Sequence, residues 1–315
     1  MSALVHIGYH KTASTWLQVH LFKHPDVGLR SIGKSAIDVR ARELVSTRAL
    51  EFDAQAVRER FAPALDEVRE RGLLPVVSNE RLSGHPVSGG FDSKEIADRL
   101  AEVFPGAKVL MVIREQRSMI RSVYKQYVLA GGPCTFPKFV DGPEDPNARV
   151  PQFDLGFYQY DRLLRHYRSR FGDGNVLALP YEQFVRDPPG FVEAIGAFAG
   201  RPIAPEVAGS MKFREVRHRT PPAVMIGLTR WGNRLARRSQ YHPAPVVDSP
   251  RLFAGVQRVA RSETVRGLVP RRLLESRDRA LEAMIEAAVG DRYVESNRRT
   301  AELTGLDLGG YGWAV

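Results

Sequence analysis

A lysine stands at the start of a short polar stretch that follows an apolar run near the N-terminus. The stretch "GYHKTASTW" covers residues 8–16 and joins one lysine to three hydroxyl side chains. A strand that turns into a helix gathers free backbone N–H groups at the positive end of the helix dipole. The pattern predicts an anion-binding loop, in which the backbone from Ala13 to Trp16 and the hydroxyls of Ser14 and Thr15 donate hydrogen bonds.

The position of Lys11 argues against a nucleotide-triphosphatase loop. That device has the order G-x-x-x-x-G-K-[ST], with the lysine after a second glycine. Here the second glycine is absent, and Lys11 precedes Ser14 and Thr15 by three and four residues. A conventional ATPase or GTPase is therefore disfavoured. Taken alone, the loop also fits a strand–turn–helix with an incidental lysine.

The order Lys-Thr-Ala-Ser-Thr-Trp (11–16) resembles the 5′-phosphosulfate loop of the sulfotransferases. These enzymes use 3′-phosphoadenosine 5′-phosphosulfate (PAPS) as sulfuryl donor and release 3′-phosphoadenosine 5′-phosphate (PAP). The family pattern is roughly Pro-Lys-[Ser/Thr]-Gly-[Ser/Thr]-[Thr/Ser]-Trp, so His10 replaces a proline and Ala13 a glycine. Bacterial members often carry Tyr-His-Lys-Thr, and an alanine predicts a negative φ at position 13. The resemblance implies that the donor is bound by Lys11, Thr12, Ala13, Ser14, Thr15 and Trp16.

A second site strengthens this resemblance. The family binds the 3′-phosphate with an arginine at a strand end and a serine eight residues later, on the next helix. Here the run "KVLMVI" (108–113) ends at Arg114, and Ser122 follows eight residues on. Arginine offers a planar fork for phosphate, and serine adds a short neutral donor. Surface solvation would explain either residue alone, whereas the spaced pair favours a phosphate site.

Two further segments resemble the family: the first looks like its strand and helix after the lid, and the second is similar to the C-terminus of bacterial sulfotransferases related to the carbohydrate-modifying branch. They are residues 177–200 and the C-terminal residues 293–313. The resemblance thus covers most of the chain and is weakest over 205–275. The glycine-rich segment that closes over the nucleotide in cytosolic animal enzymes is not evident, and the basic region is the candidate for that role.

The resemblance implies a mechanism without a metal. Lys11 can reach the oxygen that bridges phosphorus and sulfur, where negative charge grows during transfer. An acceptor hydroxyl also needs a base, and Glu80 follows the apolar run 73–78 at the sheet edge where α/β active sites lie. A partly desolvated carboxylate has the raised pKa suited to this task. The alternative is that Glu80 caps the following turn or pairs with Arg81.

Other side chains are weaker candidates for the site. His10 is a second possible base, or a residue that shapes the loop. His24 and His85 precede prolines, so turn positions explain them. Ser78 could contact the donor or the acceptor. Trp231, beside Arg230 and Arg234, could stack on a sugar acceptor, although a buried tryptophan on an amphipathic helix is the simpler interpretation.

The elements that position these residues alternate between apolar runs and helical patterns. Continuous apolar runs at 3–8, 73–78, 108–113 and 175–180 predict buried parallel strands. Helices are expected at 15–23, 51–71, 93–103 and 117–129, the last with an apolar face of Ile120, Val123, Tyr124, Tyr127 and Val128. The alternation predicts an α/β, P-loop-like, three-layer fold with a central parallel sheet flanked by helices, as in the sulfotransferase fold.

Two segments interrupt this alternation. Residues 131–152 contain five prolines and predict a long loop, of the kind that often forms a lid. Residues 241–250 form a second break. We expect one sulfotransferase domain over 1–315, with 205–280 as a basic helical subdomain or lid.

Charge is concentrated in one part of the chain. The net charge is +10, and residues 212–279 hold 16 lysines and arginines against five acids. Such a segment favours an anionic ligand, although a solvated arginine-rich surface fits nearly as well. Cys134 is the only cysteine, which excludes a disulfide framework and a cysteine-built zinc site. We expect no signal peptide, no transmembrane segment and a cytoplasmic protein.

These features lead to three hypotheses for the function. The leading hypothesis is transfer of a sulfuryl group from PAPS to the hydroxyl of a small molecule or glycan, a carbohydrate or glycolipid that could be anionic. An atypical P-loop nucleotide kinase is the second, and it lacks a Walker lysine and a magnesium-holding aspartate in place. A non-catalytic nucleic-acid-binding protein that uses residues 212–279 is the third, and it leaves the Lys11 loop unexplained. We expect no nucleic-acid partner and no metal.

Overall fold

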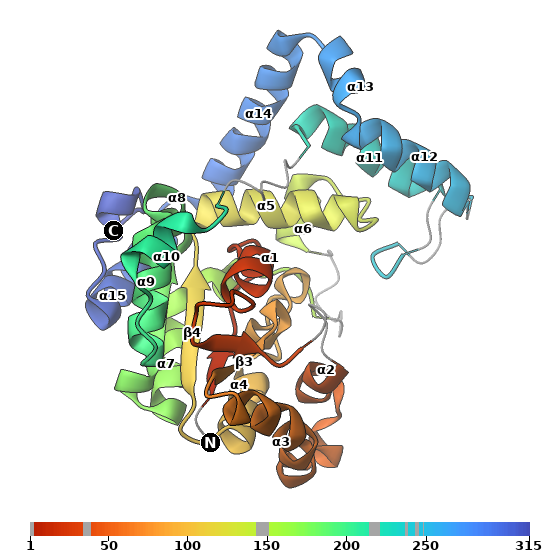
Figure 1. Ribbon diagram of the computed structural model, residues 1–315. Helices are drawn as coiled ribbons and strands as arrows, with labels where there is room; N and C mark the ends of the chain where they lie inside the picture. Colours follow the sequence, from red (N-terminus) through yellow and green to blue (C-terminus); the bar gives the residue numbers. More distant parts are fainter. Residues whose placement is uncertain are drawn as a thin grey trace. The chain divides into compact units, whose positions relative to one another are not determined.

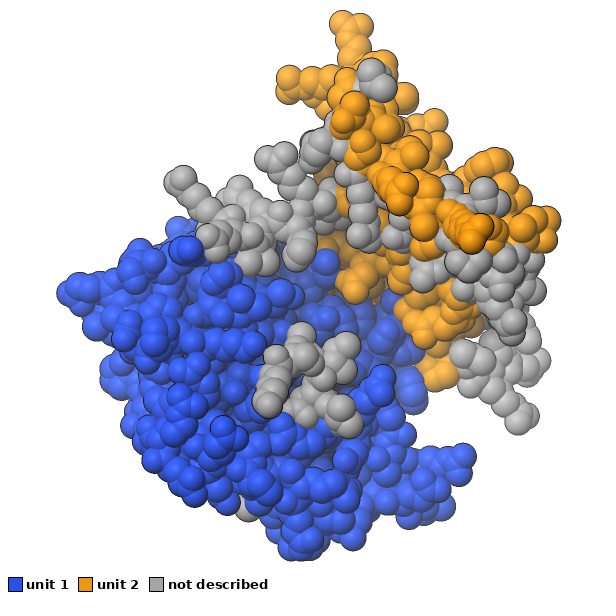
Figure 2. All heavy atoms as spheres, turned by 45° about the vertical axis from the view of Figure 1, so that its right-hand side comes forward, with its two compact units in different colours: residues 1–115, 156–217, 293–315 blue, residues 116–155, 218–292 orange. Residues whose placement is uncertain are grey.

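The computed structural model describes residues 3–33, 39–142, 151–213, 221–236, 239–242, 246–247 and 249–315 (Figure 1). The chain divides into two compact units, coloured separately in Figure 2. Unit 1 comprises residues 1–115, 156–217 and 293–315, and unit 2 comprises residues 116–155 and 218–292. The expectation of a single domain over 1–315 stays a prediction.

Unit 1 is built on a five-stranded sheet in the order β2-β3-β1-β4-β5. All its neighbouring strands are parallel. The four expected strands are present, and the fifth, β2, was missed because its sequence, Leu-Arg-Ser, is not a continuous apolar run. The strands are β1 Leu4–His6, β2 Leu29–Ser31, β3 Leu74–Ser78, β4 Lys108–Ile113 and β5 Val176–Pro180.

Helices cover both faces of this sheet, which confirms the expected α/β class with a central parallel sheet. Leu110 and Val112 of β4 belong to one hydrophobic cluster with residues from the helices on that face. The alternate residues Val109 and Met111 are also fully buried and face the opposite way. The first face is covered by α1 Ser14–Trp16, the π-helix η1 Leu17–Leu21, α9 Pro188–Ala199 and α10 Pro205–Ser210, and the second by α3 Ala54–Glu70, α4 Ser93–Val103 and α7 Tyr160–Phe171.

Local signals explain where several of these helices begin. Asp53 caps α3 by accepting hydrogen bonds from the amides of Gln55 and Ala56. The helix predicted over 93–103 has these bounds in α4. The segment predicted at 15–23 begins at Ser14 as α1, and a π-helical turn follows it.

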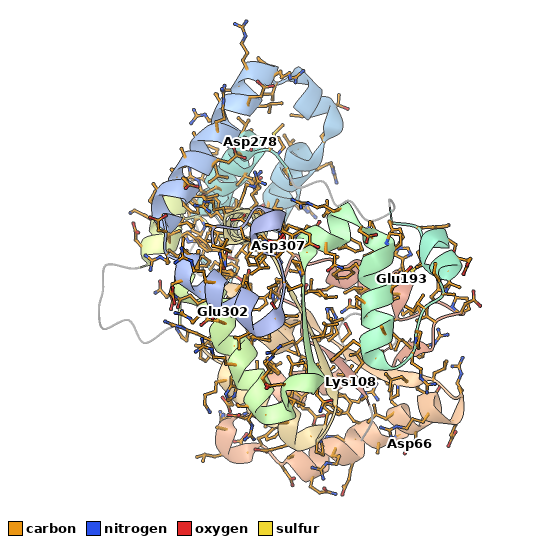
Figure 3. All side chains as sticks on the ribbon, turned by 90° about the vertical axis from the view of Figure 1, so that its left-hand side faces the viewer. Asp66, Lys108, Glu193, Asp278, Glu302 and Asp307 are labelled. Atoms are coloured by element: carbon orange, nitrogen blue, oxygen red, sulfur yellow. The ribbon has the colours of Figure 1, made fainter. Side chains whose placement is uncertain are left out.

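Polar contacts fasten other elements of unit 1 to the layers. Lys108, labelled in Figure 3, donates from Nζ to the carbonyl of Phe198 (2.5 Å) and ties α9 to β4. Asp161 of α7 is buried and accepts hydrogen bonds from Ser296 and Arg299 of α15. The remaining elements are α2 Val39–Ser46, α8 Tyr181–Arg186, α15 Val294–Thr304 and the short helices η2 Ala49–Glu51, η3 Glu80–Ser83, η4 Pro86–Ser88, η5 Leu155–Tyr158 (which begins in unit 2), η6 Asp173–Asn175 and η7 Gly309–Tyr311.

The regular elements of unit 2 are helices over its described residues. Its elements are α5 Gln116–Leu129, α6 Phe136–Asp141, α11 Ala223–Ala236, α12 Pro250–Arg261, α13 Glu263–Leu268 and α14 Arg271–Val289. The expected apolar face of α5 is confirmed, because all five of its predicted residues are buried. Ion pairs join α5 to α14, from Arg117 to Glu286 and from Arg121 to Glu282 (2.5 Å).

The loop predicted over 131–152 is wrong in part. Residues 136–141 form α6, whose Phe136 and Phe139 pack on Tyr124. Burial of these two rings stabilises the helix, whereas the prolines of this segment predict a loop. Residues 143–150 of the same segment lie outside the described residues. In the second break, Ser239 and His242 form an isolated antiparallel bridge.

Candidate active site

Three neighbouring strands of the sheet bring the predicted site residues together. The order β3-β1-β4 places the carboxyl ends of these strands side by side. Glu80 follows β3, Lys11 follows β1 and Arg114 follows β4. In an open parallel sheet, ligands bind beyond these ends, where the strand order reverses. Residues far apart in the sequence thus meet within unit 1.

The loop after β1 has an unusual backbone. Lys11 and Ala13 have φ angles of 67° and 63°, in the left-handed region. The expectation of a negative φ at Ala13 is therefore wrong: this alanine adopts the conformation that glycine favours. Each such residue costs about 1–2 kcal/mol. Backbone strain of this kind persists only where its surroundings hold it, and it gathers at functional sites.

Hydrogen bonds hold the strained loop. The Thr12 hydroxyl is fully buried and donates to the carbonyl of Tyr9. The amide of Leu17 donates to the carbonyl of Ala13 (3.0 Å), which begins the helix. The amides of Ser14, Thr15 and Trp16 precede that first helical hydrogen bond, so they are available to a ligand.

The hydroxyls of the loop differ in their surroundings. Ser14 Oγ is buried and has no hydrogen-bond partner among the described residues, whereas Thr15 is exposed. An unpaired buried hydroxyl is costly, and a ligand oxygen would satisfy it. Trp16 is buried: it donates from Nε1 to the carbonyl of Lys212 (3.1 Å) and stacks on Phe213. Its indole therefore anchors the helix, and only its backbone can serve a ligand.

Arg114 connects the end of β4 to the loop. Its Nη1 donates to the carbonyl of Lys11 (3.0 Å), and its guanidinium lies 4.7 Å from the centre of the Tyr181 ring. The Tyr160 hydroxyl donates to the Arg114 carbonyl (2.6 Å). The guanidinium is thus placed beside the loop that carries Lys11.

Lys11 and Glu80 perturb each other's titration. Burial lowers the pKa of Lys11, an effect that Glu80 opposes and Arg114 reinforces. Burial raises the pKa of Glu80, and Lys11 opposes this rise. The described residues offer no acid within ion-pair distance of the Lys11 amine. A poorly solvated cation thus lies near a carboxyl group whose raised pKa suits proton transfer.

The alternative roles of Glu80 are filled by other residues. Asn79 caps the turn, because its side chain accepts a hydrogen bond from the amide of Arg81 (2.9 Å). The Arg81 guanidinium pairs with Asp92 (2.5 Å). Glu80 therefore neither caps this turn nor pairs with Arg81, and its carboxylate is left facing the loop.

His10 lies beside Glu80 but is a poor base. Its Nε2 is 3.8 Å from Glu80 Oε1, and its Nδ1 is buried without a partner among the described residues. Burial lowers the pKa of His10 to about 3, and His85, Arg81 and Lys11 add to the effect. The His85 ring packs edge-on against His10 at 6.0 Å. The turn position expected for His85 does not predict this contact, because no local signal ties His85 to a residue 75 positions earlier.

The Ser78 hydroxyl takes part in a hydrogen-bond network with residues on both sides of the loop. His6 Nδ1 lies 2.7 Å from Ser78 Oγ, and Gln18 Nε2 donates to the same oxygen (3.1 Å). A side chain at Gly8 would approach His6 Nε2 to 2.6 Å, so only glycine fits there. This network connects β1 and β3 to the helix that follows the loop.

Two of the sequence candidates lie in unit 2. Ser122 is buried in α5, so solvation at the surface does not explain it. Its pairing with Arg114 on one phosphate stays a prediction. Trp231 of α11 is 65% exposed, so the interpretation of a buried tryptophan is wrong. Within the described part of the chain, no group of three histidine, cysteine or acidic residues could hold a metal.

A family model for the Sulfotransferase family matches residues 93–205. The match confirms the predicted resemblance and, with it, the predicted enzyme class: a sulfotransferase. It covers more than a third of the chain and includes Arg114 and Ser122, whereas Lys11 and Glu80 lie outside it.

Solved sulfotransferases are similar to the chain at low identity. One from Alicyclobacillus acidocaldarius is 19% identical, with a TM-score of 0.47, over 66% of this chain and 88% of that chain. The sulfotransferase domain of the curacin biosynthetic pathway is 13% identical, with a TM-score of 0.42, over 91% and 98%. Mouse SULT7A1, solved with PAP, is 13% identical, with a TM-score of 0.39, over 96% and 88%. No curated protein matches the chain.

Proposed function

We propose that the protein transfers a sulfuryl group from PAPS to a hydroxyl acceptor, a carbohydrate or glycolipid. The observation that carries the proposal is the meeting of Lys11 and Glu80 at the ends of β1 and β3, each perturbed by burial and by the other. A cation for a leaving group and a base for an attacking hydroxyl are the two requirements of this reaction.

The loop fits the phosphosulfate end of the donor. The amides of residues 14–16 and the unpartnered Ser14 hydroxyl would donate to its oxygens. Ala13 adopts the left-handed conformation that the family's glycine provides. The 3′-phosphate would lie against Arg114, whose side chain is held at the loop by the Lys11 carbonyl and Tyr181. Ser122 would be its second donor.

In the proposed step, the acceptor oxygen attacks sulfur in line with the bond between sulfur and the bridging oxygen. Glu80 takes the proton of the acceptor hydroxyl as the new O–S bond forms. The bond to the bridging oxygen breaks, and the electron pair stays on the phosphate of PAP, where Lys11 stabilises it. Glu80 serves better than His10, because a base with a pKa of about 3 holds a proton poorly at neutral pH.

Calorimetric titration with PAP tests the donor site. We expect saturable binding that Lys11→Ala combined with Arg114→Ala abolishes. The double variant Lys23→Ala with Arg42→Ala removes the same charge from exposed positions of unit 1 and should bind normally. Absence of PAP binding in the unmodified protein would overturn the proposal.

A second experiment tests the base. We expect Glu80→Gln to retain PAP affinity and to lose turnover of PAPS with sugar acceptors. Unchanged turnover would assign proton transfer to another group.

A further inference from the structure

Helix α11 has one face buried within unit 2 and a row of apolar side chains that is open to solvent. Met225, Thr229 and Asn233 are fully buried within unit 2. The Asn233 amide donates to the carbonyls of Val128 (2.7 Å) and Gly132 (2.9 Å), which fixes the orientation of α11 on α5. The other face carries Leu228, Trp231 and Leu235, which are 52%, 65% and 37% exposed. Their spacing of three and four residues aligns them in one row.

The row continues into the segment after the helix. The amide of Val247 donates to the carbonyl of Leu235 (2.7 Å), so this segment returns to the end of α11. Val246 and Val247 are themselves 78% and 50% exposed. We name Leu228, Trp231, Leu235, Val246 and Val247 the 228–247 stripe. A soluble surface seldom gathers so many large apolar residues, unless a partner covers them.

Arginines dominate the charged residues of the segment that carries the 228–247 stripe. Residues 221–262 contain seven arginines and a single acid, Asp248. Arg234 on α11 and Arg251 and Arg258 on α12 are exposed. The described part of this segment therefore combines exposed aliphatic and indole groups with exposed arginines, which favours a partner that is both apolar and anionic.

We propose that the 228–247 stripe docks unit 2 on the surface of an anionic phospholipid bilayer. An interfacial helix inserts leucine and tryptophan at the level of the headgroups, while arginines contact lipid phosphates. A second copy of the chain would bring two arginine-rich surfaces together, which like charges oppose. Nucleic acid would use the arginines but would leave the leucines and valines exposed to water. Among the described residues no helix could cross a membrane, so the contact lies on the surface.

Tryptophan fluorescence gives a direct test on the full chain. Of the three tryptophans, Trp16 and Trp313 are buried and Trp231 is exposed. Vesicles of phosphatidylcholine mixed with phosphatidylglycerol should shift the emission to the blue and protect it from acrylamide. Vesicles of phosphatidylcholine alone should do so far less. Added salt should weaken the effect, because it screens the arginines. The variant Trp231→Phe should lose the spectral shift and still float with the vesicles.

Matched variants separate apolar insertion from charge. Leu228→Ser should weaken flotation with anionic vesicles about tenfold, whereas Leu50→Ser, at a fully exposed position of unit 1, should not. Arg234→Glu should weaken it about fivefold or more, whereas Arg71→Glu, which changes the net charge equally, should have little effect.

Three results would overturn the proposal. The first is the absence of binding to anionic vesicles. The second is a Leu228→Ser variant that binds as tightly as the unmodified chain, since adsorption would then be purely electrostatic. The third is a dimer in solution whose Trp231 is already shielded from acrylamide, which would assign the stripe to a second copy.

Discussion

Two lysines, one in each unit, are largely withdrawn from solvent, and they differ in whether a carboxylate pairs with them. Lys125 of α5 lies 3.4 Å from the carboxylate of Asp278, which is labelled on α14 in Figure 3. Lys11 has no ion-pair partner in the part of the chain that the structure describes. Burial lowers the pKa of both lysines. The comparison teaches that unit 2 neutralises a buried cation, whereas unit 1 leaves one available to an anionic ligand.

The carboxylates near these lysines, Asp278 and Glu80, also differ in how fully they are paired. Asp278 accepts from Lys125 and also from the amide of Ala223 (3.0 Å), so it joins three helices of unit 2. Glu80 has His10 at 3.8 Å and Lys11 nearby, and its pKa is raised rather than lowered. Asp278 is held as a structural partner, while Glu80 is left able to exchange a proton.

Removing each lysine should affect different properties. We expect Lys11→Ala to lower the turnover of PAPS by about 10²–10³, the usual cost of removing a group that stabilises charge in a transition state. Lys125→Met should retain turnover, because it removes a cation that the fold already neutralises. Chromatographic assay of PAP release, with sugar acceptors, measures both. Equal losses of turnover in the two variants would contradict the comparison.

Removing the two carboxylates should affect stability more in unit 2 than in unit 1, the reverse of the order expected for turnover. We expect Asp278→Ala to lower the free energy of unfolding by about 2 kcal/mol, because it leaves Lys125 and the Ala223 amide unpaired. The partial exposure of Asp278 keeps the cost below that of a fully buried pair. Glu80→Ala should change the free energy of unfolding by less than about 0.5 kcal/mol. Urea denaturation measures both, and a greater loss for Glu80→Ala would refute the assignment.

The pH dependence of kcat/KM should report the two groups of unit 1. Below the pKa of Glu80, which burial raises above its usual 4.5, activity should fall about tenfold for each pH unit as the base is protonated. Activity should also fall as pH rises through the pKa of Lys11, which burial lowers from 10.5. Glu80→Gln should remove the acid limb of the residual profile, and Glu70→Gln, at an exposed position, should leave it intact. An acid limb that survives in Glu80→Gln would identify another base.

Replacing alanine by glycine should have opposite effects on the free energy of unfolding in the loop and in a regular helix. We expect Ala13→Gly to raise the free energy of unfolding by about 0.5–1 kcal/mol, because glycine adopts a φ of 63° without strain. Ala280→Gly, at an exposed position of α14, should lower it by about 1 kcal/mol. Thermal unfolding distinguishes the signs. A destabilised Ala13→Gly variant would show that the loop is not strained at this position.

Much of the fold could be predicted because its signals are local. Buried parallel strands are continuous apolar runs, and four of the five could be recognised as such. Helix α5 carries its apolar face at regular spacing, and α4 has the predicted bounds. By contrast, β2 has three residues, and α6 depends on Phe136 and Phe139 packing against Tyr124. Such elements are stabilised by contacts that a single segment does not reveal.

The sequence alone determined the chemistry of the site: a lysine ahead of three hydroxyls, an arginine at a strand end and a carboxylate after a third strand. Only the tertiary structure decided how these groups meet. The strand order β3-β1-β4 brings Glu80 and Arg114 to Lys11, and Asn79 and Asp92 take the roles that Glu80 could have had. Burial then shifted their pKa values, and the loop imposed a left-handed backbone on Ala13. The exposure of Trp231 was decided in the same way, because solvent accessibility depends on which neighbours cover a side chain and not on its type.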